Sequence, residues 1–274
     1  MNKTEFSSDF QVSLGDAVLT WHDEDFGSVE FALEKAEMEG VWQDEELSGS
    51  INLDMAEHSQ LSSSWRLPVP ARWPIKPINN GRISGHLGGF FKERGLVGIL
   101  WPDIVQDTRG EVDVDTLIAG TWENPEVSGE AHVKNGQVHI PAAGITISNI
   151  EINTQFNDDR IVVEKLTGVS GPGELSATGR IGLQRWAPTE ISLEVAGHDF
   201  TLIDLPELRL RAKPDLILTG TKSDLQLSGT IEIPYFLAVG RSGRSPVQTS
   251  PDAVIVGQKT VADTKELPFN LKTN

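Results

Sequence analysis

The chain of 274 residues contains no cysteine, which excludes disulfide bonds, thiolate zinc sites and a cysteine nucleophile. Basic residues are also few, because 23 Lys and Arg stand against 40 Asp and Glu and leave a net charge of −17. No run of clustered Lys and Arg occurs, so the sequence argues against binding to nucleic acid, or to an anionic membrane through a basic patch. Any contact with lipid is therefore expected to be apolar.

Long apolar runs are absent as well. Residues Met1 to Phe10 are polar and acidic and lack the basic and apolar regions of a signal peptide, and no apolar run of about 18 residues follows. The sequence as written is therefore expected to be soluble. Because the chain stops within the alternating stretch Leu267 to Leu271, which resembles a strand cut before its partner, we interpret the sequence as a fragment.

What the sequence does contain is an alternation of apolar and polar residues with a period of two. Side chains with this period lie on one face of a β-strand. Gly, Pro, Asn and Asp interrupt the alternating segments about every ten residues, a spacing typical of short strands joined by tight turns. The sequence therefore predicts an all-β fold built from repeating short strands.

One tight turn is predicted at Asn135-Gly136, because a two-residue Asn-Gly loop suits the positive φ angles of an antiparallel hairpin. That hairpin would pair Val133 with Val138 and Ala131 with Ile140. All four side chains would then share one face. The polar residues between them would share the other face.

A second hairpin is predicted around Asp158-Asp159, although this loop is a weaker turn signal than Asn-Gly. It would place Phe156 opposite Ile161. Ile152 and Val163 would then lie on the same face as that pair.

An internal repeat points to a sheet that grows by adding one unit. Residues 118–129 match residues 218–229 at an offset of 100 residues, and similar units in which alternation follows a glycine begin at Gly81, Gly110 and Gly179. Repeats of this kind are typical of quasi-linear architectures, in which each unit packs mainly on its neighbours. We therefore expect an elongated sheet.

We divide the chain into four segments. Residues 1–66 are expected to form N-terminal β repeats, with Val29 to Met38 as a strand. The Pro-rich residues 67–80 are expected to form a connector, because proline lacks the N–H that a sheet ladder requires. Residues 81–240 would form the main trough, and residues 241–274 a loop and truncated final strands.

Four stretches resemble the C-terminal region of the TamB family in their order and spacing, over roughly residues 80 to 260. They are Gly120 to Gly129, Val133 to Pro141, Gly171 to Gly179, and Gly229 to Pro234 followed by Asp252 to Gly257. Members of this family are inner-membrane-anchored subunits of the translocation and assembly module of Gram-negative bacteria.

The resemblance implies an elongated, curved antiparallel sheet, a β-taco or open β-trough, related to AsmA-like and bridge-like lipid-transfer proteins. It implies a periplasmic location, as a fragment of an inner-membrane-anchored protein. It also implies phospholipid traffic to the outer membrane, or support for outer-membrane protein assembly and secretion. A TamA-like barrel would be a partner of the full-length protein, since neither the signal anchor nor the extreme C-terminal segment of the family is recognised in this sequence.

An apolar sheet face must be covered by another layer or by a ligand, and the sequence offers no good covering helix. We therefore predict that this face carries apolar cargo, either phospholipid acyl chains or a nascent outer-membrane protein. No catalytic residue, metal or cofactor is expected. The predicted groove residues are Val133, Val138, Ile140, Ile191, Leu193, Val195, Leu216, Leu218, Leu225, Leu227, Ile231 and Ile233.

Two other readings of the sequence stay open. In the first, the alternating residues fill the closed core of a rigid structural protein, such as a β-sandwich or a β-helical passenger, which would exclude lipid. In the second, the chain is a polysaccharide-active β-helix enzyme that uses paired acids such as Asp113/Asp115 or Asp23/Asp25. Surface acids of this kind are more often a solvated face, so we predict a protein without enzyme activity.

A metal site is the remaining chemical possibility. The predicted Asn-Gly hairpin would place His132 beside His139 on the polar face, where two imidazoles could hold a divalent cation. Lys134 on the same face would repel such a cation, and no third ligand is evident. We interpret both histidines as surface residues.

Overall fold

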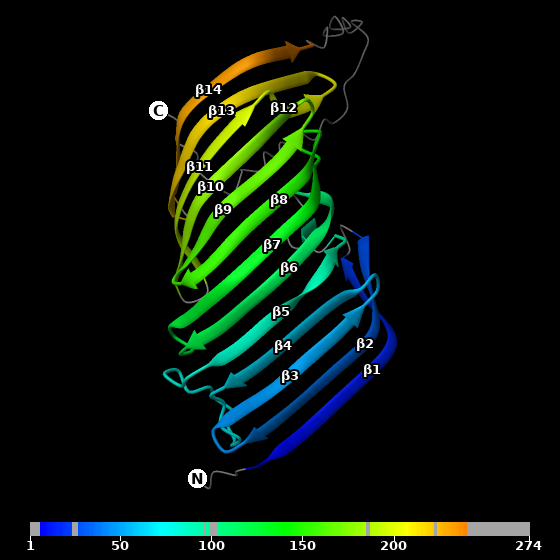
Figure 1. Cartoon of the computed structure of the whole chain (residues 1–274), viewed down its shortest axis with the longest axis vertical. Coiled ribbons are helices and arrows are strands. Elements are labelled where there is room, and N and C mark those ends of the chain that lie inside the picture. Colours follow the sequence, from blue (N-terminus) through cyan, green and yellow to red (C-terminus); the bar gives the residue numbers. More distant parts are fainter. Residues whose placement is uncertain are drawn as a thin grey trace, which may run out of the picture.

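The computed structural model describes residues 6–23, 27–95, 97–98, 104–184, 187–221 and 224–239. These residues form the 14 strands of one antiparallel sheet that is open at both edges (Figure 1). The predicted all-β fold, an elongated antiparallel sheet, is confirmed. The strands are β1 (Ser8–Asp23), β2 (Gly27–Gln43), β3 (Glu46–Met55), β4 (Ser59–Leu67), β5 (Ser84–Glu93), β6 (Gln106–Gly120), β7 (Pro125–Ile140), β8 (Ile145–Asp158), β9 (Arg160–Ser170), β10 (Gly173–Gln184), β11 (Ala187–His198), β12 (Phe200–Leu205), β13 (Leu208–Thr221) and β14 (Asp224–Ala238).

The sheet follows the order of the sequence from β1 to β11. Strand β13 then pairs with β11 along its C-terminal half and with β12 along its N-terminal half, so β12 lies beyond the end of β11. Strand β14 pairs with the other side of β13 and forms the second edge of the sheet. The predicted strand from Val29 to Met38 is part of β2. Nearest-neighbour pairing of this kind explains the long, oblique ladder in Figure 1.

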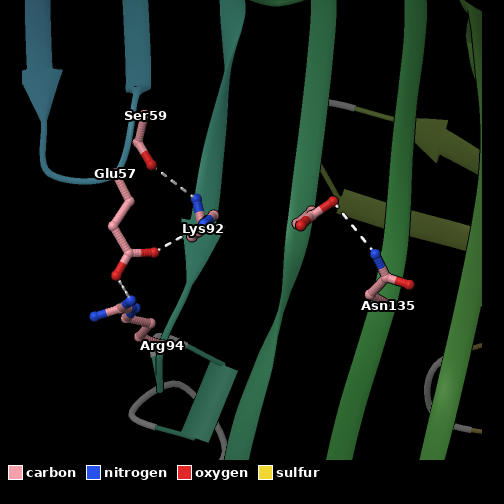
Figure 2. Close-up of polar contacts among 6 residues, drawn as sticks. Glu57, Ser59, Lys92, Arg94 and Asn135 are labelled. Atoms are coloured by element: carbon pink, nitrogen blue, oxygen red, sulfur yellow. Dashed lines mark hydrogen bonds and ion pairs between the residues drawn. The ribbon is translucent and has the colours of Figure 1, made fainter.

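The strands are longer than the turn signals predicted, because several of these signals lie inside strands as bulges. The predicted hairpin at Asn135-Gly136 is wrong, since β7 runs through both residues from Pro125 to Ile140. Asn135 has the expected positive φ of 53°, but the register with β8 shifts there instead of reversing. The Asn135 amide donates to Glu111 on β6 at 3.4 Å (Figure 2).

The bulge at Asn135 still leaves the apolar side chains of β7 on one face. Val133 pairs with Ile152, while Val138 pairs with Ile147 on the same strand β8. One extra residue in β7 restores the alternation that an odd spacing would otherwise break. The predicted face is therefore confirmed for Val133 and Val138, although the predicted pairing between them is wrong.

The second predicted hairpin is confirmed. Strands β8 and β9 meet at Asp158-Asp159, and Phe156 pairs with Ile161. On the same ladder, Ile152 pairs with Leu166.

The internal repeat corresponds to equivalent structure. Gly129 on β7 has a φ of 126° and Gly229 on β14 has a φ of 128°, a conformation that L side chains rarely adopt. A Cβ on Gly129 would lie 2.1 Å from the backbone oxygen of Asp115, and a Cβ on Gly229 would lie 2.1 Å from that of Asp215. The two glycines therefore mark the same bend, 100 residues apart in the sequence.

Two segments fold over the ends of the strands. At one rim, Phe200 and Ala212 are 3% and 0% exposed, and Ser170 donates a hydrogen bond to the Thr201 carbonyl at 2.9 Å. Strand β12 thereby packs on the ends of β8, β9 and β10. At the opposite rim, residues 68–83 connect β4 and β5 outside the named strands.

A polar cluster ties the β3–β4 turn to the end of β5. The carboxylate of Glu57 accepts a hydrogen bond from Lys92 Nζ at 2.8 Å and also pairs with Arg94 (Figure 2). The hydroxyl of Ser59, which is 4% exposed, accepts the backbone N–H of Lys92 at 3.2 Å. These contacts join the β3–β4 turn to the end of β5, at the rim opposite to residues 68–83.

Strands β4 and β5, which flank the Pro-rich residues 67–80, pair directly with each other. The four-segment division of the chain stays a prediction. The predicted loop and final strands in residues 241–274 lie outside the described residues. Within the described ranges, no helix has the length and apolar character needed to cross a membrane.

Candidate functional site

The apolar face of the sheet is continuous from strand to strand. Residues directly opposite each other on paired strands share a face, so the ladders can be followed across the sheet. The predicted residues Val133, Val195 and Leu216 fall in one such row. This row, from β6 to β13, is Val112, Val133, Ile152, Leu166, Ala177, Val195 and Leu216.

A second row brings three predicted leucines together. Leu193 on β11 pairs with Leu218 on β13, which pairs with Leu227 on β14. In the neighbouring row, Ile191 and Leu225 both lie opposite Gly220. All of these leucine and isoleucine side chains are half-buried, although no second layer of strands packs on this part of the described sheet.

The remaining predicted residues lie toward one rim or at the sheet edge. Val138 and Ile140 pair with Ile147 and Ile145. Ile231 pairs with Pro214 and is 48% exposed, and Ile233, in the following bulge, is 55% exposed. Both are more exposed because β14 has a neighbour on one side.

Glycines alternate with large side chains on this face in the N-terminal half. A Cβ added to Gly40 would lie 2.3 Å from the ring of Phe10, and one added to Gly49 would lie 2.8 Å from the ring of Trp65. The rings therefore lie over the glycines of the paired strands, an arrangement that covers exposed backbone. Aromatic rings and glycines of neighbouring strands thus share the apolar face in this half of the sheet.

Several residues of this face were not predicted, because the clearest alternation in the sequence lies near the C-terminal end. Strand β3 has the same signal, since its alternate residues from Leu47 to Met55 are apolar or glycine. Ladder partners place these on the same face as Trp65 and Leu61 of β4. The period-two pattern of β3 therefore predicts these residues as well.

The opposite face is polar and charged. The predicted pairing of His132 and His139 is wrong, because both lie on β7 with the bulge between them. His132 Nδ1 lies 3.1 Å from the side-chain oxygen of Asn153, and His139 Nδ1 lies 3.2 Å from the hydroxyl of Thr146. No group of three or more potential metal ligands gathers among the described residues.

The paired acids Asp113 and Asp115 both lie on the polar face of β6. Asp115 Oδ1 lies 2.8 Å from His86 Nε2, and both side chains are exposed on the polar face. Asp113 lies on the same face of β6 and pairs with Phe90 and His132 in the ladders. Asp25 lies outside the described residues.

A depression of about 1080 Å³ lies at the strand ends near the β8–β9 turn. Its lining includes Arg160 and Arg180 together with the acids Glu126, Asp158 and Glu190. The charges of both signs make this depression unsuitable for an acyl chain, because burying them would require desolvation. It is separate from the apolar rows.

The Lys165 ammonium lowers the pKa of Glu151 on the polar face, through a hydrogen bond of 2.5 Å and the attraction between the charges. Because the pKa is lower in the folded state, the pair stabilises the fold above the unfolded-state pKa. This contribution is lost as the pH falls through the folded-state pKa. The effect on stability is small, since solvent screens both exposed groups.

We expect Lys165→Met to raise the pKa of Glu151 toward its ordinary value. An NMR titration of the Glu151 carboxyl carbon measures this shift directly. Lys213→Met, which removes a lysine 3.4 Å from Glu232, is the matched control and should leave the Glu151 titration unchanged. Equal midpoints in the wild type and Lys165→Met would contradict the assignment.

Comparisons with known proteins agree with the resemblance predicted from the sequence. The family model described as TamB C-terminal domain matches residues 159–273. The translocation and assembly module subunit TamB of Haemophilus influenzae is 28% identical over 180 residues. The match covers 59% of this chain and 13% of that relative, so the chain corresponds to a small part of it. No solved structure matches the chain significantly.

Proposed function

Residues 159–273 match the model of the TamB C-terminal domain, and from this similarity we propose that the chain is a non-enzymatic part of an envelope-biogenesis protein. Its apolar face would serve as the floor along which apolar cargo moves. The observation that carries the proposal is the pair of apolar ladder rows that run from β6 to β13 and from β11 to β14, while β12 packs only on the ends of β8, β9 and β10 in the described structure.

Burial of acyl chains on this face would be favourable, at about 0.8 kcal/mol for each methylene removed from water. The whole sheet is on the order of 60 Å long, since its strands are spaced by about 4.8 Å and all but β12, which lies beyond the end of β11, stand side by side. Successive rows carry similar aliphatic side chains, so neighbouring positions differ little in depth. Cargo can therefore move by diffusion along the floor.

Phospholipid is the favoured cargo, and a nascent outer-membrane strand would present apolar groups to the same surface. The relative's name describes a subunit of a translocation and assembly module. We further propose that the chain lies in the periplasm as part of an inner-membrane-anchored protein. A TamA-like outer-membrane barrel would be the partner of the full-length protein.

The test is site-specific photo-crosslinking in a Gram-negative host, with the photoreactive residue at Leu193, Leu218 or Leu227. Thr230 and Glu232 are exposed residues of β14 and serve as matched controls. We expect phospholipid adducts at the leucines at least tenfold above those at the controls. Mass spectrometry of the adducts identifies the cargo.

Adducts only to other residues of the same chain would overturn the proposal and favour a closed structural protein. Protein adducts at the leucines, without lipid, would replace phospholipid by a nascent membrane protein as cargo. Both outcomes are separated in one experiment because lipid and peptide adducts differ in mass.

A further inference from the structure

The Pro-rich residues 68–83, here called the rim segment, differ in charge from the rest of the chain. The segment contains Arg72, Lys76 and Arg82 and no Asp or Glu, whereas the whole chain has a net charge of −17. Its three cations are spaced apart in the sequence, so they form no basic run. Their common location becomes evident when the segment is placed at one rim of the sheet.

The base of the rim segment is firmly attached to the sheet. The indole N–H of Trp42 donates to the Val69 carbonyl at 2.8 Å, and the Ala71 N–H donates to the Asp44 carbonyl at 2.8 Å. Ala71 is 1% exposed, and its carbonyl accepts the N–H of Phe6 at 3.0 Å. The segment is thus a pre-organised element rather than a free linker.

The tip of the rim segment exposes large apolar side chains. Trp73 is 71% exposed and Ile75 is 43% exposed, with Lys76 exposed beside them. A second exposed tryptophan, Trp122 at 42%, lies in the β6–β7 turn. This turn is next to the rim segment, since Arg82 forms an isolated β-bridge with Thr121. Two tryptophans and the three cations of the rim segment therefore occur along the same rim, where Glu123 directly follows Trp122.

This combination has a specific chemical fit. Tryptophan favours the membrane–water interface, where its ring meets apolar chains and its N–H meets polar groups. Lysine and arginine beside it are attracted to anionic headgroups. The acidic β2–β3 turn lies at the base of the segment, and its Glu46 is paired with Arg66 at 3.1 Å.

We propose that the rim segment docks on the surface of a bilayer that contains anionic phospholipid, with Trp73 and Ile75 inserted at the headgroup level. Docking at this rim would bring a membrane next to the edge of the apolar floor. The proposal is independent of cargo transport, because the rim segment would bind the surface whether or not the apolar face carries lipid.

The absence of cysteine allows a direct test. A single cysteine introduced by Ile75→Cys is labelled with an environment-sensitive nitrobenzoxadiazole dye, and the protein is mixed with vesicles of equimolar phosphatidylglycerol and phosphatidylcholine. Leu117→Cys is the matched control, since Leu117 is a 55% exposed apolar residue that pairs with His86 on the polar face. Circular dichroism verifies that both labelled proteins keep their strand content.

We expect dye emission at position 75 to rise at least threefold with anionic vesicles and to stay unchanged at position 117. Lys76→Glu in the same labelled protein should reduce the vesicle affinity about tenfold, and high salt should act similarly. No rise at position 75, or equal rises at both positions, would overturn the proposal. An equal rise in emission with vesicles of pure phosphatidylcholine would also overturn it. A rise in emission with protein concentration in the absence of vesicles would overturn it in favour of contact with a second copy of the chain.

Discussion

Gly129→Val is expected to destabilise the fold by about 2–6 kcal/mol, because the new side chain meets two separate obstacles. The backbone of Gly129 has a φ of 126°, which costs a residue with a Cβ about 1–3 kcal/mol. The added Cβ would also lie 2.1 Å from the backbone oxygen of Asp115, so strand β6 must move away from β7. Overpacking of this kind costs about 1–3 kcal/mol more.

Urea unfolding followed by circular dichroism measures this loss as a lower midpoint. Gly15→Val is the matched control, since Gly15 also lies in a strand but a Cβ there has no atom within 4 Å. We expect the control to change stability by no more than about 0.5 kcal/mol. Similar shifts for both variants would show that the bend at Gly129 is not required by the sheet.

Leu218→Glu is expected to block cargo movement while the sheet still forms. Leu218 is the middle residue of the row that joins Leu193 and Leu227, so a carboxylate there would interrupt the apolar floor from β11 to β14. An acidic side chain in contact with acyl chains costs about 3 kcal/mol, which corresponds to a roughly hundredfold drop in occupancy. Phospholipid adducts from a photoreactive residue at Leu193 should fall to that extent.

Thr219→Glu is the control for added charge, because Thr219 is exposed on the polar face, opposite Gln226. We expect its adduct yield to match that of the wild type. Urea unfolding of both variants separates a blocked floor from a misfolded chain. Unchanged adducts in a folded Leu218→Glu protein would mean that cargo does not pass over this row.

Much of the candidate surface could be predicted from the sequence, because face membership is a local property of alternating residues. Ile191, Leu193 and Val195 lie on one face of β11, as their period-two alternation predicted. The hairpin that pairs Phe156 with Ile161 was also predictable, since the turn residues and the alternation on either side of them indicate the same pairing. The lipid role of this face stays a proposal.

The bulge at Asn135-Gly136 could not be predicted from the same local signals. A residue such as Asn135, with a positive φ of 53°, is compatible with a hairpin turn and with a bulge. The choice depends on whether β7 finds partners on both sides along its whole length. Here β6 and β8 both extend past the bulge, and their ladder bonds outweigh a local turn.

The sequence by itself determined that the chain forms strands with one apolar and one polar face, because a period of two requires no knowledge of distant residues. Only the tertiary structure decided where the sheet bends, which turn signals become bulges, and that Trp73 lies at a rim near Trp122. The physical reason is that these features depend on pairing between strands far apart in the chain. A pairing of this kind, such as Arg82 with Thr121, leaves no signal in the local pattern of residues.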